Sequence, residues 1–400
     1  MKFTRTPLWS IATVNDEVLS DDTDADFEFT YVDIGSISDN RISDRTYQVS
    51  FRESPSRARR VVQLGDIALS TVRTYLRAIA PVTEDYVNAV FSTGFAIIRP
   101  DQTVCNPSFL RYALLSDEFI DEVVSHSNGV SYPSITAGEV MRICIDFPIL
   151  EAQQRIADYL DRETAEIDAA VADLDKYVEL LEKRKRATGL AILEQARHEP
   201  TTLMVHLGSL GLFVSGSGFP HRYQGVEGEE FPFYKVGSLS TADEDGIIQD
   251  SRHSVSREVA EELGAKIIPT GSVLMAKIGE AMRLCRFVVT ATDCCIDNNM
   301  MAIIPRQDSI TSDYLRLALE LVTVDVLVNP GPVPSLNVQG LRMFSIPLPS
   351  VGVQERMTTE WNKETDRLDS LIAESTRLRD LLLKRRSVLI TEVVTGRKQV

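Results

Sequence analysis

Hydrophobic residues recur with the period of a coiled-coil helix in the stretch that follows Pro148. From there to about Gln195 the chain has no proline and a single glycine, so little in the sequence would break a helix. Two sets of residues, each spaced seven apart, alternate along this stretch, which is the period of about 3.5 residues of a coiled-coil seam. They are Leu160, Ile167, Leu174 and Leu181, with Thr164, Val171 and Val178 between them.

A second stretch near the C-terminus has a similar pattern. Leu368, Leu371, Leu378 and Leu382 are spaced three, seven and four residues apart, and Ser375 takes the remaining seam position. A helix of about 40 residues is roughly 60 Å long, which exceeds the diameter of a domain of about 150 residues. We therefore expect each helix to pack against the other copy. The simpler alternative is an amphipathic helix that lies on its own domain.

The two helical stretches belong to an internal repeat that includes most of the chain. A shift of 201 residues aligns Gln153 with Gln354 and Asp168 with Asp369, without a gap over about fifty positions. Upstream the match is looser, and residues 29–38 (FTYVDIGSIS) are similar to residues 231–240 (FPFYKVGSLS). The chain is a tandem duplication in which a variable globular part precedes a better-matched helix.

The globular parts contain short β-prone runs bounded by Gly, Pro or Asp. In the first copy the expected strands are residues 31–34, 67–71, 95–98 and 143–147, and the expected helix is 108–115. We predict an α+β fold in which two long antiparallel coiled-coil helices join two globular domains, related by a pseudo-two-fold axis. The predicted domains are residues 1–150 and 200–350, and the predicted spacer helices are 151–199 and 351–400.

Composition and charge exclude several classes of protein. The 400 residues are 44% hydrophobic and 25% charged, as in ordinary globular chains. The chain has neither an apolar signal peptide at its start nor a stretch of about 18 apolar residues, so we expect a cytoplasmic protein without membrane contact. Five cysteines without a C-x-x-C spacing are interpreted as packing residues. A net charge of −16 argues against a general polyanion binder.

No motif in the sequence supplies a catalytic or metal site. The five histidines form no H-x-x-x-H pair, and G-x-S-x-G and Walker A motifs are absent. The glycine-rich residues 214–220 (VSGSGFP) are not followed by a helix that would bind a phosphate, so we interpret them as a turn. Residues 329–332 (NPGP) lack the aromatic ring with which amino-methyltransferases stack a flipped base. We therefore expect neither catalysis nor a metal ion nor a cofactor in this chain.

Arginine is concentrated in the first globular part. Eight arginines and three carboxylates lie between Arg41 and Arg77, an excess of five positive charges. Arginine offers paired donors to guanine or phosphate, and side-chain amides do the same for adenine. Two similar domains on a spacer also suit two DNA sites, because major-groove faces recur about 34 Å apart. The candidate DNA-binding residues are Arg41, Arg45, Arg57, Arg59, Arg60, Arg73 and Arg77, and then Lys235, Arg252, Lys277, Arg283, Arg286, Asn298 and Asn299. The alternative for both sets is a solvated surface patch.

Residues at the exits from both globular parts resemble one protein family. Segments 145–156 (IDFPILEAQQRI) and 346–356 (IPLPSVGVQER) are similar to its pattern of P-L-P, then E-Q-x-x-I and a helix ending near L-x-x-x-K-x-x-L. The turn 216–220 (GSGFP) and the strand 231–237 (FPFYKVG) add to the likeness. The first exit has DFP in place of P-L-P, and QQ and QE vary the E-Q pair. Over nearly its whole length the chain resembles the specificity subunit of type I restriction-modification systems.

The resemblance implies a function in DNA recognition. Each globular domain would read one half of a bipartite sequence in double-stranded DNA, and the helices would set the spacing and dock two modification (methyltransferase) subunits. Those subunits would hold S-adenosylmethionine, and restriction subunits would use ATP and Mg²⁺. Two alternatives stay open: a coiled-coil adaptor whose globular parts bind proteins, and a self-contained adenine methyltransferase.

Overall fold

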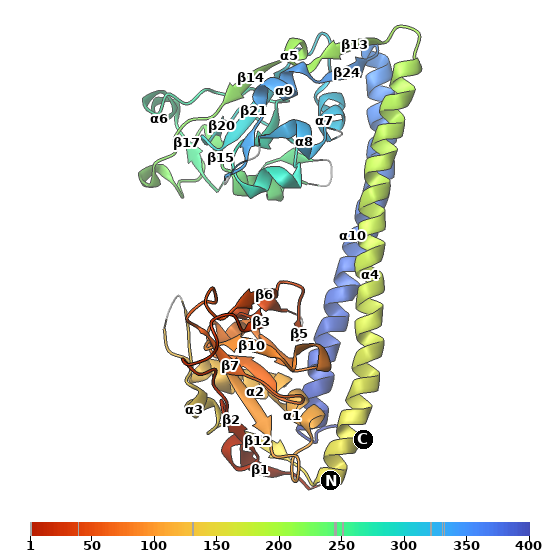
Figure 1. The fold of residues 1–400 in the computed structure, drawn as a ribbon. Coiled ribbons are helices and arrows are strands. Elements are labelled where there is room, and N and C mark those ends of the chain that lie inside the picture. The colour runs from red at the N-terminus through yellow and green to blue at the C-terminus, as the bar shows by residue number, and fades with distance from the viewer. Residues whose placement is uncertain are drawn as a thin grey trace. The chain divides into compact units, whose positions relative to one another are not determined.

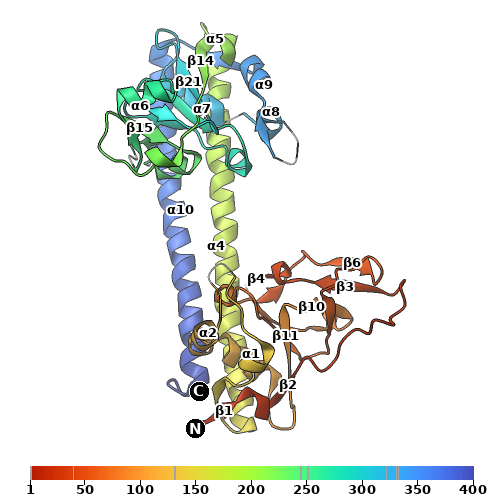
Figure 2. The same cartoon turned by 90° about the vertical axis from the view of Figure 1, so that its left-hand side faces the viewer.

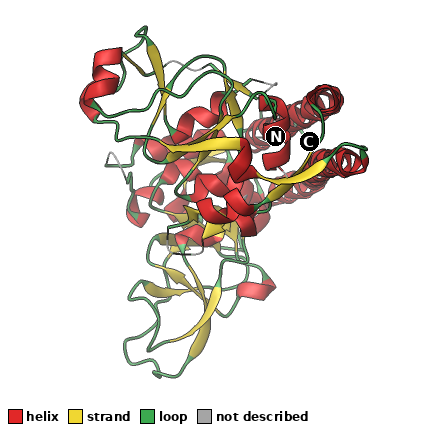
Figure 3. Ribbon diagram, turned by 90° about the horizontal axis from the view of Figure 1, so that it is seen from above, coloured by secondary structure: helices red, strands yellow, loops and turns green. Residues whose placement is uncertain are grey.

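The structure, a computed structural model, describes the whole chain except for eleven residues. Helices and strands are mixed in both globular parts (Figure 3), which confirms the predicted α+β class. The chain divides into two compact units, which are described separately: unit 1 consists of Met1–Leu174 and Arg377–Val400, and unit 2 of Asp175–Thr376. The residues outside the description are Met1, Asp39, Val130, Ser131, Glu244, Asp245, Asp250, Ser251, Leu321, Pro330 and Pro332, together with the side chains of Arg283, Glu320, Val324 and Asp325.

Two four-stranded sheets form the core of the globular part of unit 1 (Figure 1). Val32 and Phe91 of one sheet meet Ala68 and Ile97 of the other in one buried cluster, so the sheets face each other. Leu69, the neighbour of Ala68, enters a different cluster on the opposite face, as the alternation of side chains along a strand requires. The strand orders are β6 (Tyr47–Ser50), β3 (Glu28–Val32), β10 (Ala89–Ser92), β7 (Ala58–Val61), and β2 (Ala12–Val14), β11 (Phe95–Pro100), β8 (Ile67–Ser70), β9 (Ile79–Pro81). Strands β3 and β10 are parallel, and the other pairs are antiparallel.

Short helices pack on the outer face of the second sheet of unit 1. Polar caps fix where they begin: the side chain of Asn106 accepts from the backbone N–H of Phe109, and Thr136 forms a capping box with Glu139. The helices are α1 (Pro107–Leu115), α2 (Asp117–Ser125) and α3 (Ala137–Val140). Two further strand pairs are β1 (Thr4–Pro7) with β12 (Cys144–Phe147), and β4 (Ile37–Ser38) with β5 (Arg41–Ile42).

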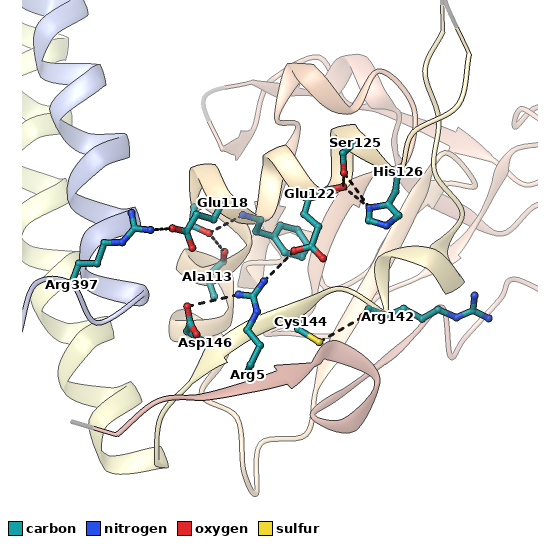
Figure 4. A network of polar contacts seen from close by, with 12 residues as sticks. Arg5, Ala113, Glu118, Glu122, Ser125, His126, Arg142, Cys144, Asp146 and Arg397 are labelled. Carbon is teal, nitrogen blue, oxygen red and sulfur yellow. Dashed lines mark hydrogen bonds and ion pairs between the residues drawn. The ribbon is translucent and has the colours of Figure 1, made fainter.

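Both ends of the chain are attached to helix α2 of unit 1. Figures 1 and 2 show the termini at the same end of this unit. The guanidinium of Arg5 lies 3.1 Å from Glu122 and 3.8 Å from Asp146, and that of Arg397 contacts Glu118 (Figure 4). Each exposed ion pair contributes little by itself. Together they hold the first strand and the C-terminal tail against one helix.

The globular part of unit 2 repeats this plan. Strands β15 and β20 are parallel, as β3 and β10 are in unit 1. The sheets are β14 (Gly211–Ser215), β21 (Met300–Pro305), β18 (Val273–Ala276), β19 (Val288–Thr290), β16 (Ile247–Ile248), and β17 (Ser254–Val255), β15 (Phe231–Tyr234), β20 (Cys295–Ile296). The remaining pairs are β13 (Leu203–His206) with β24 (Ser345–Leu348) and β22 (Val328–Asn329) with β23 (Ser335–Leu336).

The globular part of unit 2 contains the helices α5 (Leu207–Leu210), α6 (Arg257–Glu262), α7 (Ser312–Glu320), α8 (Val324–Leu327) and α9 (Val338–Met343). Three of them, α7 to α9, occupy the places in the chain that α1 to α3 occupy in unit 1. Short 3-10 helices lie in the loops of both units. These are η1 (Leu8–Ser10), η2 (Ile34–Ser36), η3 (Thr74–Leu76), η4 (Glu84–Tyr86), η5 (His221–Tyr223), η6 (Val236–Thr241) and η7 (Glu280–Leu284).

Two long helices, α4 (Leu150–His198) and α10 (Val351–Val394), follow the globular parts. A fully buried glutamine in the first turn anchors each of them. Gln153 donates to the carbonyls of Pro148 (2.8 Å) and Val104 (3.1 Å) and accepts from the backbone N–H of Asn106 (2.8 Å). The amide therefore satisfies three backbone groups at the junction of helix and globular part.

Gln354 repeats this arrangement in unit 2. Its amide donates to the carbonyls of Pro349 and Ser309, both at 2.9 Å, and accepts from the backbone N–H of Thr311 at 2.9 Å. The two glutamines are the pair that the 201-residue shift aligns. The duplication thus preserves a specific hydrogen-bonding device as well as a sequence pattern.

Within each unit the segments of α4 and α10 run side by side in opposite directions (Figures 1 and 2). In unit 1, Asp168 lies 2.8 Å from Arg386, and Tyr159, further back on α4, contacts Lys398, further along the chain. Leu160 of α4 packs in one cluster with residues from the end of α10. The antiparallel coiled coil is therefore confirmed in this unit.

Unit 2 repeats the pairing with the roles of the helices exchanged. Lys185 of α4 lies 2.8 Å from Asp369 of α10, and Glu199, just after α4, lies 2.5 Å from Arg356. The 201-residue shift aligns Asp369 with Asp168, and Lys185 with the arginine that Asp168 contacts. The helices of this unit are antiparallel as well.

The predicted seam is right for α4 and partly wrong for α10. Leu368 and Ser375 are buried as predicted, but Leu378 is 50% exposed. The prediction places the second set of inward residues three positions after the first. In the structure the second set includes Arg386 and Val393, which lie four positions after Leu382 and Leu389. Arg386 can occupy such a position because it faces the carboxylate of Asp168. The assumption that every seam position is apolar therefore wrongly placed Leu378 in the seam.

Other predicted elements agree with the structure at most positions. The four expected strands and the expected helix correspond to β3, β8, β11, β12 and α1. Exceptions include Ile34, which begins η2 instead of continuing β3, and Thr71 and Ile143, which lie just outside β8 and β12. None of the described helices is long and apolar enough to cross a membrane. The four-domain division stays a prediction, because each compact unit combines one globular part with portions of both helices.

Candidate nucleic-acid interface

Three loop segments meet at one edge of unit 1, which we call the three-segment edge. The backbone N–H of Thr71, after β8, donates to the carbonyl of Gly94 in the turn between β10 and β11 (2.9 Å). The N–H of Arg73 donates to the carbonyl of Pro133, in the segment before α3 (2.7 Å). Next to these three segments, the backbone N–H of Thr93 in the turn donates to the carbonyl of Arg57, the residue before β7 (2.8 Å). Two predicted DNA-binding residues, Arg57 and Arg73, therefore lie on one hydrogen-bonded frame.

Unit 2 contains the same edge with different side chains. The N–H of Lys277 donates to the carbonyl of Asn299 (2.7 Å), and the N–H of Gly279 donates to that of Pro334 (2.9 Å). Lys277 and Asn299 correspond to Thr71 and Gly94 of unit 1, and Gly279 and Pro334 correspond to Arg73 and Pro133. The predicted residues Lys277, Asn298 and Asn299 consequently share this second edge, and Asn298 is exposed.

Arg73 adopts an unusual backbone conformation at the edge of unit 1. Its φ of 52° and ψ of 50° place it in the left-handed region, which residues with a Cβ rarely occupy. Its guanidinium lies over the ring of Tyr132, 4.6 Å from the ring centre. Tyr132 was not among the predicted residues. The signal that was available is its position directly before the repeated Pro-Ser pair.

A pair of tyrosines lies near Arg57 on the first sheet of unit 1. The rings of Tyr31 and Tyr47 meet edge to face with centres 5.6 Å apart. Burial raises the pKa of Tyr31, and a hydrogen bond with Ser92 and the nearby charge of Arg57 oppose this rise. The phenol therefore stays protonated at neutral pH. It can donate a hydrogen bond beside the arginines.

In unit 1, β10 lies between β3 and β7. The corresponding strand of unit 2 is β20, which pairs with β15 on one side and with the segment after β14 on the other. Ser217 pairs with Asp297 in a parallel bridge, and its N–H donates to the carbonyl of Ile296 (3.1 Å). A Cβ on Gly216 would lie 2.1 Å from the carbonyl oxygen of Asp297, so only glycine fits. Part of the predicted turn 214–220 is therefore a strand-like segment packed against the edge.

Asp297 lies beneath the predicted lysines of unit 2. It is 5% exposed, and its carboxylate accepts from the backbone N–H of Asn299 (2.9 Å). Burial raises its pKa, and this hydrogen bond together with the charges of Lys235 and Lys277 opposes the rise. Lys235 also donates to Gln224 (3.1 Å). Three of the predicted residues, Lys235, Lys277 and Asn299, thus surround one buried carboxylate.

Aromatic stacking fixes the loop that follows Gly216. The rings of Phe219 and Phe233 are parallel within 8° and their centres are 3.8 Å apart. His253 meets Phe219 edge to face at 5.6 Å and accepts from the backbone N–H of Gly225 (2.9 Å). This small apolar cluster holds the loop against β15.

Two of the predicted arginines of unit 1 contact carboxylates away from the three-segment edge. Arg41, on the β4–β5 hairpin, lies 3.6 Å from Asp168 of α4. Arg77 lies 2.5 Å from Asp117 and also donates to Ser387 of α10 (3.3 Å). Both guanidinium groups therefore connect the globular part with the helices. As DNA-binding residues they stay predictions.

Three further predicted arginines of unit 1 differ in exposure. Arg59 lies 3.0 Å from Asp21 and 5.2 Å from the ring centre of Phe51. Arg60, on β7, is half-buried, its Nε has no partner within the described residues, and burial lowers its pKa. Arg45 is exposed.

The remaining predicted residues of unit 2 lie on other surfaces. Arg252 is exposed, and the side chain of Arg283 lies outside the described residues. Arg286 lines a groove of 560 Å³ between the globular part and α4, together with Lys183 and Arg186. Its lining also includes Lys185 and the carboxylate of Glu182.

The described residues hold no group of three or more His, Cys, Asp or Glu side chains that could bind a metal ion. The cysteines are free thiols, and Cys105, Cys294 and Cys295 are buried. Burial raises the pKa of Cys105 to about 12 and that of Cys295 to about 11. These thiols stay protonated at neutral pH, which agrees with their interpretation as packing residues.

Residues 65–173 match the family model described as "Type I restriction modification DNA specificity domain". The matched segment includes the loop after β8, the turn before β11 and the Pro-Ser segment, which are the three segments of the three-segment edge. A curated relative, the type I restriction enzyme HindI specificity subunit of Haemophilus influenzae, is 30% identical over 111 residues. That alignment spans 27% of this chain and 24% of the relative, about a quarter of its length.

Solved structures resemble the chain over nearly its whole length. One, described as "Structural basis underlying complex assembly and conformational transition of the type I R-M system", has a TM-score of 0.67 at 22% identity and covers 98% of both chains. The HsdS subunit from Thermoanaerobacter tengcongensis has a TM-score of 0.46 at 23% identity, covering 98% of this chain and 97% of that one. The first of these shows the same fold. Residues 65–173 of the chain are therefore similar to a type I restriction modification DNA specificity domain.

Proposed function

We propose that this chain is the DNA-recognition subunit of a type I restriction-modification complex and has no catalytic activity by itself. The observation that carries the proposal is that the three-segment edge occurs twice, with the same two backbone hydrogen bonds and different side chains. One edge presents Arg57 and Arg73, and the other presents Lys277, Asn298 and Asn299. A repeated frame with different donors suits the two unlike halves of a bipartite target.

The chemistry of the two edges fits double-stranded DNA. Arginine can donate two hydrogen bonds to guanine, asparagine can exchange two with adenine, and either Lys or Arg can contact phosphate. The net charge of −16 limits binding that depends on phosphate attraction alone. Specific contacts at the edges and phosphate contacts from partner subunits would then share the binding free energy.

The helices are the proposed docking surface for two modification subunits. In unit 1, Leu378 and Leu381 of α10 are exposed, and in unit 2, Tyr177 and Leu180 of α4 are exposed. Helices α4 and α10 of unit 2 also border a groove of 320 Å³, which is lined by Leu181, Leu368 and Leu371. Exposed apolar residues at helical spacing suit the packing of further helices.

The cofactors of the complex would belong to the other subunits. S-adenosylmethionine would bind to the modification subunits, and restriction subunits would use ATP and Mg²⁺. The chain itself would need neither a cofactor nor a metal ion. The whole complex would act in the cytoplasm, where its DNA target lies.

The decisive experiment is co-expression of the chain with modification subunits of the type I class, followed by methylome sequencing of the host. We expect one bipartite methylated motif with a fixed gap, and no methylation by either component alone. Truncation after residue 199 serves as a matched control, because it removes the second globular part and α10. The expected result is loss of the intact bipartite motif.

Other outcomes would favour the alternatives. Methyl transfer by the purified chain with S-adenosylmethionine alone would make it a self-contained methyltransferase. Absence of DNA retention by a complex that assembles normally would favour a coiled-coil adaptor. Either result would contradict the proposed function.

A further inference from the structure

We propose that Arg73 reads a guanine base in the major groove of the half-site bound by unit 1, and that Tyr132 is the positioning residue for its guanidinium. The inference rests on the proposed function and deepens it, because it names the base and the side chain that recognises it. It depends on three features of Arg73: its backbone conformation, the stacking of its side chain and the absence, among the described residues, of a carboxylate that pairs with it.

The backbone conformation indicates that the side chain at position 73 has a task. Arg73 has a φ of 52°, and its N–H is fixed to the carbonyl of Pro133 at 2.7 Å. Gly279, at the same place in unit 2, shares the positive φ (90°) but not the ψ, which is −179° there and 50° at Arg73, and it makes the equivalent bond to Pro334 at 2.9 Å. Glycine adopts positive φ without strain, whereas arginine does not. The frame itself requires no side chain here, so the strain at position 73 is kept for the sake of the guanidinium.

The guanidinium of Arg73 is held flat but left free to donate. It lies 4.6 Å from the centre of the Tyr132 ring, and Tyr132 is 63% exposed, so the stack lies at the surface. Stacking occupies one face of the guanidinium and leaves the N–H groups in its plane available. Within the part of the chain that the structure describes, no carboxylate pairs with Arg73, in contrast to Arg59 and Arg77.

A planar group with two parallel free donors is complementary to the O6 and N7 acceptors of guanine. Pre-organisation by the ring lowers the entropy lost when a flexible arginine binds. A phosphate would accept the same donors, but it requires no fixed plane and carries no sequence information. The stack therefore favours a base contact over a backbone contact.

The test compares methylomes of hosts that carry the complete complex with wild type or one variant. Arg73→Gly is the informative change, because the corresponding residue of the repeat is glycine and the frame is therefore retained. We expect its motif to lose a guanine requirement at one position of one half-site while the other half stays the same. Arg306→Ala, which removes an exposed arginine just after β21, at the end of that strand opposite Asn299, is the control and should leave the motif unchanged.

Binding measurements on the identified target separate a base contact from a phosphate contact. Replacement of that guanine by 7-deazaguanine removes the N7 acceptor and should weaken binding of the wild-type complex roughly tenfold. The Arg73→Gly complex should bind both duplexes equally. Tyr132→Phe should keep the wild-type preference because it keeps the ring, and Tyr132→Leu should reduce it.

Two results would overturn the inference. One is an unchanged motif in the Arg73→Gly complex. The other is a uniform loss of affinity for all sequences with a salt slope lower by about one, which would make Arg73 a phosphate contact. A wild-type complex that methylates no bipartite motif would instead refute the proposed function.

Discussion

Two glycines of one turn, Gly216 and Gly218, differ in the space around them. A Cβ on Gly216 would lie 2.1 Å from the carbonyl oxygen of Asp297, whereas one on Gly218 would meet nothing within 4 Å. We expect Gly216→Ala to lower the free energy of unfolding by about 1–3 kcal/mol, since the backbones must move apart. Gly218→Ala should change it by less than about 1 kcal/mol. Urea denaturation followed by circular dichroism measures both, and equal effects would contradict the packing described.

The buried carboxyl of Asp297 should make stability depend on pH. Burial raises its pKa above the ordinary value of 3.8. The stability that its neutral form supports is complete below the unfolded pKa and is lost as pH rises through the folded pKa. Asp297→Asn keeps an acceptor for the backbone N–H of Asn299 and removes the charge. We therefore expect the variant to gain stability relative to wild type as pH rises from acidic to neutral.

Denaturation midpoints of both proteins at several pH values test this expectation. The exposed carboxylate of Glu227 provides a matched substitution, Glu227→Gln, in the same unit. A difference between wild type and Asp297→Asn that shrinks with rising pH would contradict the assigned direction.

Charge alone located part of the candidate site. Arg57 and Arg73 were predicted because they lie in an arginine-rich stretch, and the structure does bring them to one edge. The same signal could not separate them from Arg41 and Arg77, because their carboxylate partners are far away in sequence. Tyr132 carries no charge, so no count of cations would have found it.

At the scale of elements, burial separates two leucines of α10, of which only Leu378 was a predicted seam residue. Leu389 is 8% exposed and packs in the core of unit 1, whereas Leu378 is 50% exposed. We expect Leu389→Ala to lower the free energy of unfolding by about 2–4 kcal/mol, and Leu378→Ala by less than about 1 kcal/mol. Thermal or urea unfolding measures the difference. If Leu378 belongs to the docking surface, its variant should instead weaken association with modification subunits.

The long helices were predictable because a sustained period leaves few alternatives over forty residues. Strands such as β8 and β11 were predictable from short apolar runs, but their partners were not, since pairing joins residues far apart in sequence. The strand-like segment at Ser217 was interpreted as a turn for the same reason. Its structure depends on the backbone of residues 296 and 297, which the local sequence does not reveal.

At the scale of the whole molecule, duplication has kept contacts that build the frame and has changed residues that it presents. Gln153 and Gln354 make the same three kinds of hydrogen bond, and both long helices depend on them for their first turn. At the edges the backbone bonds are equally well preserved, yet Arg73 stands where the other copy has Gly279. A frame that tolerates such changes allows two half-sites to diverge independently.

Independent units should also unfold independently, and the two glutamines make this testable. Gln354→Leu leaves two carbonyls and the N–H of Thr311 without their partner, which should cost unit 2 about 2–4 kcal/mol. Trp361 is buried in unit 2, so its fluorescence in a Trp9→Phe background reports on that unit alone. We expect Gln354→Leu to lower the urea midpoint of this signal.

The matching change in the other copy should leave the Trp361 signal in place. Gln153→Leu removes the same bonds in unit 1, so it should shift only the part of the circular dichroism transition that belongs to that unit. The exposed Gln195 supplies the control Gln195→Leu, which should move neither midpoint. If both core substitutions lowered the Trp361 midpoint equally, the shared helices would be transmitting the loss, and the chain would unfold as a single cooperative unit.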